Sequence, residues 1–357
     1  MDFKILVINP GAGSTRVAVF ENKKPLFEEN IRHKPDELLK FARIIDQYEF
    51  RRDKILSFLS SKKFDLASLT AIVGRGGPFK PLTSGTYLVN DKLIEDIRTG
   101  NYQSEHPSLL GAVLAKEIAD QLGIKAYFVD PVSVDEFWGL SRYSGLKEIK
   151  RKALSHALNV RLVAKKAAKE MKRPYSECNF IIVHLGTGIT VAAHCQGKQI
   201  DSSNANEDGP FSPQRSGALP TMGLAKFIFD GKYQYQDIKK KLNREGGLLS
   251  YLGTDSIEAV EKRIDKGDKE AAAVYDAMIY QIAKEVGAYS VVLKGKIDAI
   301  IITGGIAHSK TFVEKLKSWV SFLSLQFFVY PGEGEMEGLA HGVLRVLRNE
   351  EKTKTYQ

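Results

Sequence analysis

The sequence predicts an α/β protein built from two structurally related domains, and a repeated glycine turn is the main reason. Residues 5–20 contain a β-rich apolar run, a turn with Gly11 and Gly13, and a second β-rich run. Residues 180–193 repeat this order around Gly186 and Gly188, at an offset of 175 (186 − 11 and 188 − 13). The same offset pairs Asn9 with His184 and Thr15 with Thr190. Half-chain self-similarity of this kind indicates a duplicated domain.

The first turn has the composition of a phosphate-binding loop. Glycines let backbone N–H groups approach an anion, and Ser14 and Thr15 add hydroxyl donors. The turn is not a P-loop, because no Gly-Lys-Ser/Thr follows, and not a dinucleotide-binding fingerprint, because a strand follows it instead of a helix. An ordinary hairpin turn fits the single motif equally well. Two such hairpins, one from each half, favour a nucleotide site in a cleft between the domains.

The first half alternates strands with helical patterns, as an α/β domain should. Two of its strands end in residues suited to a site: residues 69–73 lead into Arg75 and a diglycine, and residues 126–129 end at Asp130. A turn or a helix cap ahead of residues 132–137 is the other interpretation of Asp130. The remaining expected elements are a strand at 25–27, a helical region at 36–59, and a helix at 109–122 that Gly123 ends.

Residues 150–171 have helical spacing, with Leu154, Leu158 and Leu162 on one side. His156 lies about 200° round the helix from the leucine stripe and should point away from it. An outward histidine is usually only solvated, and it gains a role if that face lines a cleft. The break at 172–176 is the expected linker. We therefore predict a domain boundary at residue 175; by analogy with other two-domain kinases, residues 335–357 should return to the first domain, which gives residues 1–175 plus 335–357 and residues 176–334.

The second half repeats the strand and diglycine junction. A helix at 271–293 precedes a strand at 297–302, which leads into Gly304, Gly305 and Ile306. The diglycine can mean tight packing, or it can let a base and ribose lie on the backbone. Residues 201–220 form a long loop that contains Arg215, and loops of this length tend to be functional. A strand at 327–330, a turn and a terminal helix from Met336 complete the chain.

Composition narrows the class of protein. The 357 residues carry 52 Lys and Arg against 43 Asp and Glu, and these basic residues are dispersed instead of forming one stripe. Nucleic-acid binding usually concentrates such charge, so no nucleic-acid partner is expected. No apolar run is long enough to span a bilayer and no signal peptide is apparent, so we expect no membrane association and a cytoplasmic location. Two cysteines give no disulfide framework.

Seven stretches resemble, in chain order, the acetokinase family within the sugar-kinase, heat-shock-chaperone and actin superfamily. The Asn-Pro-Gly opening at Asn9, the Gly-Arg-Gly-Gly-Pro junction around Arg75 and the Ser-Gly-Ala-Leu-Pro after Arg215 are similar to butyrate kinases. The resemblance implies two ribonuclease H-like domains, with mixed sheets flanked by helices and an ATP cleft between them. The stretches are residues 7–15, 73–78, 129–131, 155–159, 182–188, 215–217 and 302–307.

The resemblance also implies the reaction, which is reversible transfer of the ATP γ-phosphoryl group to a short-chain fatty-acid carboxylate, with butyrate as acceptor. Such a carboxylate is ionised at pH 7 and needs no general base, so cations and donors should align the two anions. Arg215, His156, Asp130 and Asn9 resemble the catalytic residues, and Arg75 and Arg215 the substrate ligands. Residues in the phosphate and nucleotide stretches should bind ATP: Gly11, Gly13, Ser14, Thr15, Arg16, His184, Gly186, Thr187, Gly188, Gly304, Gly305 and Ile306.

A magnesium ion bridging phosphate oxygens is part of the same expectation. Its ligands should be Glu335, Asn9 and Asp130, with Glu333 as the alternative to Glu335. Arg75 is a provisional carboxylate ligand, because acetate-specific members place their arginine a few positions earlier, and Ala12 replaces a serine often found there. Branched-chain fatty-acid, propionate and acetate kinases are alternative functions, and an actin-like or chaperone-like ATPase is a distant one. The resemblance implies a homodimer or larger assembly.

Overall fold

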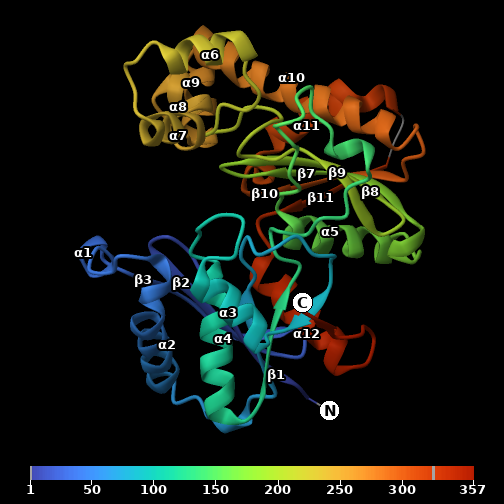
Figure 1. Cartoon of the computed structure of the whole chain (residues 1–357). Coiled ribbons are helices and arrows are strands. Elements are labelled where there is room, and N and C mark those ends of the chain that lie inside the picture. The colour runs from blue at the N-terminus through green and yellow to red at the C-terminus, as the bar shows by residue number, and fades with distance from the viewer. Residues whose placement is uncertain (1, 324–325) are drawn as a thin grey trace. The chain divides into compact units, whose positions relative to one another are not determined.

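The computed structural model describes residues 2–323 and 326–357. The chain divides by contacts into two compact units, Met1–Asp135 with Gly334–Gln357 (unit 1) and Glu136–Glu333 (unit 2). Each unit contains one mixed β-sheet flanked by helices (Figure 1). Among the described helices, none has the length and apolar character needed to cross a membrane.

The sheet of unit 1 has seven strands in the order β12-β5-β6-β4-β1-β2-β3. β1 is antiparallel to β2, and β2 to β3, whereas β4 is parallel to both β1 and β6. β1 reads as a continuous apolar run because helices cover both faces of the sheet, and its residues Ile5 to Ile8 are fully buried. The strands are β1 (Lys4–Pro10), β2 (Ser14–Glu21), β3 (Lys24–Arg32), β4 (Ala71–Arg75), β5 (Thr86–Leu88), β6 (Lys125–Val129) and β12 (Lys354–Thr355).

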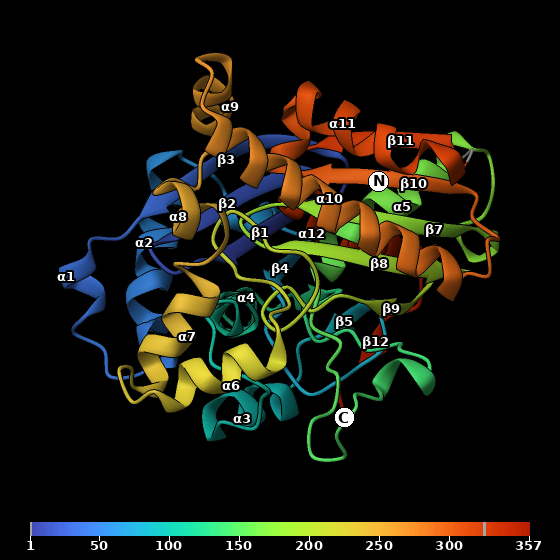
Figure 2. The ribbon, with the colours of Figure 1, turned by 90° about the horizontal axis from the view of Figure 1, so that it is seen from above.

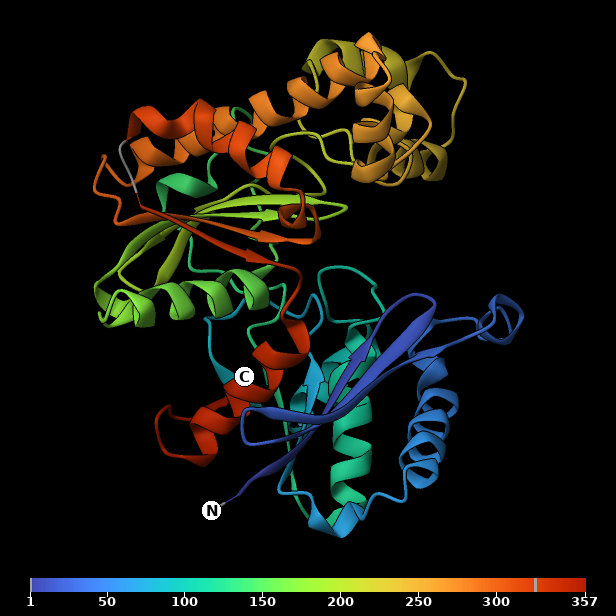
Figure 3. The same ribbon diagram turned by 180° about the vertical axis from the view of Figure 1, so that it is seen from behind.

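Helix α4 (Leu109–Leu122) lies on one face of this sheet with α2 (Tyr48–Ser61) and α3 (Asp91–Thr99), and α12 (Glu335–Leu347) lies on the other (Figure 3). α4 approaches β4 closely because both elements carry a glycine at the contact. A Cβ on Gly74 would lie 1.9 Å from the Gly111 carbonyl oxygen. The glycines of the Gly-Arg-Gly-Gly junction are therefore explained in part by packing.

The sheet of unit 2 has the order β11-β10-β7-β8-β9, which repeats the order β6-β4-β1-β2-β3 of unit 1. The strand directions also repeat, with β7 antiparallel to β8 and parallel to β10. Two structurally related domains, as expected from the glycine repeat, are confirmed. The strands are β7 (Asn179–Leu185), β8 (Ile189–Cys195), β9 (Lys198–Ser202), β10 (Ala299–Gly304) and β11 (Gln326–Pro331).

Helices cover both faces of this second sheet. α10 (Lys269–Val292) crosses β7 and β8 on one face together with α11 (Lys310–Val320), and α5 (Ala157–Glu170) covers the other face (Figures 1 and 2). Four short helices gather near the start of α10: α6 (Thr221–Phe229), α7 (Tyr235–Asn243), α8 (Gly247–Leu252) and α9 (Ile257–Asp265). The sequence-based division placed α5 with the first half, whereas by contacts it belongs to unit 2. The domain boundaries themselves stay a prediction.

The two hairpins differ by one residue. In the first, Pro10 pairs with Thr15, which leaves four residues in the turn. In the second, Leu185 pairs with Ile189, which leaves three. As a result His184 faces Thr190, whereas Asn9 faces Arg16. The offset of 175 therefore relates β1 to β7 and the glycines of the two turns. Between β2 and β8 the offset is one residue smaller, so that Arg16 corresponds to Thr190.

Two expected helices are wrong in extent. The helical region at 36–59 is broken into α1 (Pro35–Leu38), a 3-10 turn at Ile44–Gln47, and α2. The helix expected from residue 150 starts at Ala157, and Arg151 in the irregular segment before it bonds to two other parts of the chain. Its Nη1 donates to the Ser141 carbonyl at 2.9 Å and its Nη2 to the Ser202 carbonyl at 2.9 Å. The shorter elements β5, β9, β12, α3, α6 to α9 and α11 were not predicted.

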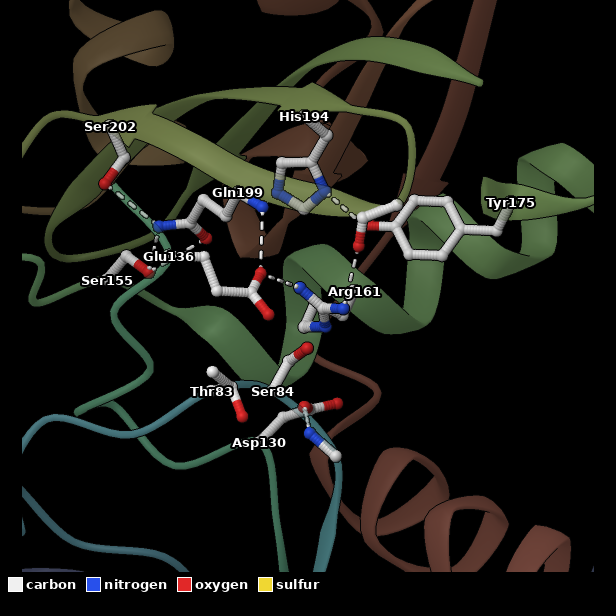
Figure 4. Close-up of polar contacts among 12 residues, drawn as sticks. Thr83, Ser84, Asp130, Glu136, Ser155, Arg161, Tyr175, His194, Gln199 and Ser202 are labelled. Carbon is white, nitrogen blue, oxygen red and sulfur yellow. Dashed lines mark hydrogen bonds and ion pairs between the residues drawn. The ribbon is translucent and has the colours of Figure 1, made fainter. Parts of the chain in front are cut away.

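A buried polar network joins α5 to β8 and β9 (Figure 4). Arg161 of α5 donates to Glu136 Oε2 at 3.0 Å, and the same carboxylate oxygen accepts the Gln199 backbone N–H at 3.1 Å. The Tyr175 hydroxyl lies 2.6 Å from His194 Nδ1, and His194 is fully buried. This network fixes α5, which directly follows the candidate site residue His156.

The network predicts an acid-sensitive stability. Burial, reinforced by the Arg161 guanidinium, lowers the pKa of His194 to about 3. The unfolded chain, with a histidine pKa of about 6.5, then binds more protons below that pH, so stability falls as the pH falls from 6.5 towards 3. We expect this group alone to lower the free energy of unfolding by about 2 kcal/mol between pH 7 and pH 5.

Urea unfolding of the wild type and of His194→Gln at both pH values measures this effect. Glutamine can still accept from Tyr175 but does not titrate, so the difference between the two pH values should shrink in the variant. Burial also lowers the pKa of His33, to about 4, which leaves a residual dependence of the same sign. An unchanged pH dependence in His194→Gln would refute the role of this histidine.

Candidate active site

Unit 1 brings together three of the candidate residues. Glu335, the first residue of α12, accepts a hydrogen bond from Asn9 Nδ2 at 2.7 Å through Oε2 and forms an ion pair with Arg75 through Oε1. Asn9 and Arg75 lie side by side because their parallel strands are in register, with Ile8 opposite Gly74. The carboxyl ends of parallel strands are where α/β sheets hold functional groups. The group thus combines a carboxylate, an amide and a guanidinium at one edge.

Asp130 follows β6, the next strand of the same sheet. Its φ of 37° is left-handed, a conformation that a non-glycine residue keeps only when its surroundings hold it. The turn at Gly85 holds it twice: the Gly85 N–H donates to Asp130 Oδ1 at 2.7 Å, and the Asp130 N–H donates to the Gly85 carbonyl at 3.1 Å. Figure 4 shows Asp130 beside Thr83 and Ser84, the residues before Gly85. The helix-cap interpretation is wrong, because residues 132–137 form no helix, but a turn does follow Asp130, with the Val134 N–H donating to the Pro131 carbonyl at 3.0 Å.

The residues of the first glycine turn differ in their exposure to solvent. Gly13 is exposed, and a Cβ there would meet nothing within 4 Å. Ser14 is half-buried, and Arg16 pairs with Glu28 on the surface. The Thr15 side chain points inward, where its hydroxyl lies 2.9 Å from His33 Nε2. The backbone of the turn, more than its side chains, is therefore the part accessible to an anion.

Unit 2 fixes its two candidate histidines against each other. His156 directly precedes α5, and its Nδ1 lies 2.8 Å from the Thr190 hydroxyl of β8. Its ring stacks on that of His184 with centroids 3.9 Å apart. Asn159 Nδ2 lies 2.8 Å from His184 Nδ1 and 3.2 Å from the Thr303 hydroxyl. The pair is thus held by side chains from α5, β7, β8 and β10.

Arg215 lies directly on the second glycine turn. A Cβ on Gly188 would fall 2.4 Å from Arg215 Nη1 and 2.5 Å from its Cζ, so only glycine leaves room for the guanidinium. Desolvation by burial lowers the pKa of Arg215, but a guanidinium stays protonated at neutral pH. Within the described part of the chain, no side chain or carbonyl accepts a hydrogen bond from this guanidinium. The result is a half-buried cation on a glycine turn with no counter-ion among the residues that the structure describes.

Close backbone packing shapes the loop that carries Arg215. Ser212 accepts the Arg215 N–H at 3.2 Å through its hydroxyl, which in turn donates to the Thr187 carbonyl at 2.5 Å. Behind the loop, a Cβ on Gly247 would lie 1.6 Å from the Ser212 carbonyl oxygen. The loop expected at 201–220 is therefore anchored to the turn at residues 186–188 and is braced by the start of α8.

The two glycines of the second diglycine, Gly304 and Gly305, differ in their surroundings. Gly304 has a φ of 94°, and a Cβ there would lie 2.3 Å from the Leu185 carbonyl oxygen, so this glycine is required by packing. Gly305 is exposed, and a Cβ there would meet nothing within 4 Å, whereas Ile306 is buried. Glu333 Oε1 lies 3.8 Å from His184 Nε2, so Glu333 belongs with the histidine pair, and Glu335 with Asn9.

Three residues that position the candidates were missed from the sequence. Asn159 lies three residues after His156, one helical turn on, and this spacing was a signal that could have found it. Ser212 lies in the long loop and Arg51 in α2, and nothing local distinguishes either of them. Arg51 donates to the carbonyls of the first glycine turn.

A known protein family matches a large part of this chain. The model of the acetokinase family matches residues 141–327, just over half of the chain. The chain belongs to the acetokinase family. It is accordingly a kinase of the carboxylate phosphotransferase type, and the matched region contains His156, the glycine turn of unit 2 and Arg215.

Solved structures of acetokinase-type enzymes share the fold. The crystal structure of Porphyromonas gingivalis acetate kinase has a TM-score of 0.80 at 20% identity, covering 97% of this chain and 100% of that one. A propionate kinase from Francisella tularensis subsp. tularensis SCHU S4 has a TM-score of 0.74 at 18% identity, covering 95% and 98%. Acetate kinase from Entamoeba histolytica has a TM-score of 0.73 at 16% identity, covering 95% and 98%. The two-sheet α/β architecture is thus that of the acetokinase family.

Proposed function

We propose that this acetokinase-family chain is a butyrate kinase, which transfers the ATP γ-phosphoryl group to butyrate and gives butanoyl phosphate and ADP. The choice of butyrate rests on three motifs, around Asn9, Arg75 and Arg215, that are similar to butyrate kinases. The choice of phosphoryl transfer to a carboxylate is supported by family membership and by the chemistry of the candidate groups.

The observation that carries the proposal is Arg215, a guanidinium set on a glycine turn without a carboxylate partner in the described residues. Two anions, a carboxylate and a phosphoryl group, repel each other as they approach. A planar guanidinium can bond two oxygens at once and neutralise the charge that develops between the reactants. We assign Arg215 to the reacting phosphoryl and carboxylate groups, with His156 as a second donor to the transferring group.

The residues of unit 1 receive complementary roles. Arg75 binds the substrate carboxylate and, before substrate is present, is neutralised by Glu335. Asn9 and Asp130 border the reacting groups, and the constrained φ of Asp130 fits a side chain held in one direction. No residue is needed as a general base, because a short-chain acid is ionised at neutral pH.

Magnesium fits this chain as a phosphate-bound ion. No group of three His, Cys, Asp or Glu side chains suited to a metal occurs among the residues that the structure describes. Mg²⁺ in phosphotransferases is held by one or two carboxylates together with phosphate oxygens and water, and the oxygens of Glu335 and Asn9 suit that role. When bound, the ion would neutralise phosphate charge. Asp130 is the further candidate ligand.

Nucleotide binding is assigned to the glycine segments. We propose that the turns at residues 11–16 and 184–188 hold phosphates through backbone N–H groups. Gly305, which has open space where a side chain would be, leaves room for the flat surface of the adenosine beside Gly304 and Ile306.

A comparison of acids tests the substrate. We expect kcat/KM for butyrate to exceed the values for acetate, propionate and isobutyrate in parallel assays with MgATP. The reason is differential binding, since each additional buried methylene stabilises a complex by roughly 0.8 kcal/mol, or about fourfold. A maximum at acetate or propionate would overturn the choice of butyrate and retain the carboxylate kinase. A maximum at isobutyrate would indicate a branched-chain fatty-acid kinase.

A further inference from the structure

Arg51 is a buried arginine that the reaction as described above does not use. It lies in α2, is fully inaccessible to solvent, and has no carboxylate among its hydrogen-bond partners in the described chain. Its Nε and Nη2 donate to Gln47 Oε1 at 3.1 and 2.8 Å. A buried charge without a counter-ion is costly, and burial lowers the pKa of Arg51 to about 10, which still leaves it charged at neutral pH.

The rest of the guanidinium is directed at the first glycine turn. Nη1 donates to the Gly11 carbonyl at 2.9 Å, to the Ser14 carbonyl at 3.0 Å and to the Thr15 hydroxyl at 3.1 Å. Nη2 reaches the Ala12 carbonyl at 3.4 Å. Three carbonyls of one short turn are therefore drawn to the same cation on the inner side of the hairpin.

This arrangement determines where the amide groups of the turn point. In a trans peptide the C=O and the following N–H are directed oppositely. Because the carbonyls of Gly11 and Ala12 point inward to Arg51, the N–H groups of Ala12 and Gly13 point outward. Both residues are exposed, and neither N–H donates to another group within the described residues. Two successive outward N–H groups are able to donate to the same anion.

We propose that Arg51 is a positioning residue for phosphate binding: by capping the inner carbonyls of the turn, it directs the Ala12 and Gly13 N–H groups towards the phosphates of the nucleotide. Its charge acts on the same anion from behind the turn. The inference rests on the proposed function insofar as the anion is the triphosphate of ATP. It adds a residue that the sequence motifs did not contain.

The test compares two ligands on the full chain by isothermal titration: AMP-PNP with Mg²⁺, which carries a triphosphate, and adenosine, which carries none. For Arg51→Met, which keeps the length but removes the charge and the donors, we expect AMP-PNP to bind at least tenfold more weakly and adenosine to bind as in the wild type. Arg51→Lys keeps the charge but cannot cap three carbonyls, so it should show an intermediate loss. Arg52→Met is the matched control, because Arg52 pairs with Asp53 at the surface.

Unchanged AMP-PNP binding in Arg51→Met would overturn the proposal. If Arg51→Lys bound AMP-PNP as tightly as the wild type, the capping of the carbonyls would have no role in binding, and that outcome would overturn the proposal as well. Equal loss of both ligands would overturn it too, because a purely structural role affects adenosine as well. If Arg51→Met does not fold, Gln47→Leu removes an acceptor of Arg51 and should weaken AMP-PNP binding selectively. A wild type that binds AMP-PNP but phosphorylates no carboxylate would refute the proposed function and leave this inference standing, whereas a wild type that binds no AMP-PNP would refute the inference.

Discussion

Arg215→Ala is expected to lower kcat by about 10³-fold while the protein remains folded, because the variant loses the charge that neutralises the transferring group. The guanidinium lies on Gly188, so the substitution removes the positive charge from this turn. Steady-state kinetics with MgATP and butyrate measures the effect, and circular dichroism and thermal unfolding check the fold.

Arg244→Ala provides the matched control for this experiment. Arg244 is an exposed arginine at the end of α7, and its backbone alone takes part in capping that helix. Activity of the control should equal that of the wild type, which excludes a general effect of removing positive charge. Near-normal formation of butanoyl phosphate by Arg215→Ala would remove Arg215 from the reaction.

Gly188→Ala should lower kcat by about 10²-fold with little loss of stability. The added Cβ would fall 2.4 Å from Arg215 Nη1, so the guanidinium must move, and displacement by about 1 Å is enough to cost this much activity. The neighbour that yields is the end of a flexible side chain, not backbone, which keeps the energetic cost small. Gly287→Ala in α10 is the control, because a Cβ there meets nothing within 4 Å.

A double variant separates displacement of Arg215 from a direct effect on phosphate binding. If Gly188→Ala acts through the arginine, it should change nothing further in the Arg215→Ala background, and the two effects should be strongly non-additive. Additive losses would show that Gly188 acts independently of Arg215, and the close approach of these two residues would then have no functional meaning.

The duplicated architecture could be predicted because short stretches of the sequence indicate it. Apolar β-rich runs on either side of Gly11 and Gly186 define two hairpins, and their spacing reveals the repeat. The one-residue difference between the two turns was not visible, because the alignment by glycines does not determine which residues pair across the hairpin. Helix α4 was predicted at its observed bounds, since Gly123 marks its end.

Long-range contacts limit what the sequence reveals about the site. His156 was expected to project from a helix, yet it precedes the helix, and Arg151 ties the chain before it to Ser141 and Ser202. The hydrogen bonds from Arg51 to the Gly11 and Ser14 carbonyls join residues 40 and 37 positions apart, and no local periodicity of the sequence predicts such contacts. Candidate residues that belong to motifs were found; the residues that orient them depend on tertiary structure.

The most direct test of the central claim is a ³¹P NMR time course of the wild type with MgATP, recorded with and without butyrate. Our account predicts an acyl phosphate resonance that grows only when butyrate is present, in step with ADP. Conversion of ATP to ADP and inorganic phosphate at the same rate without butyrate, with no acyl phosphate formed, would contradict the carboxylate kinase and support a simple ATPase.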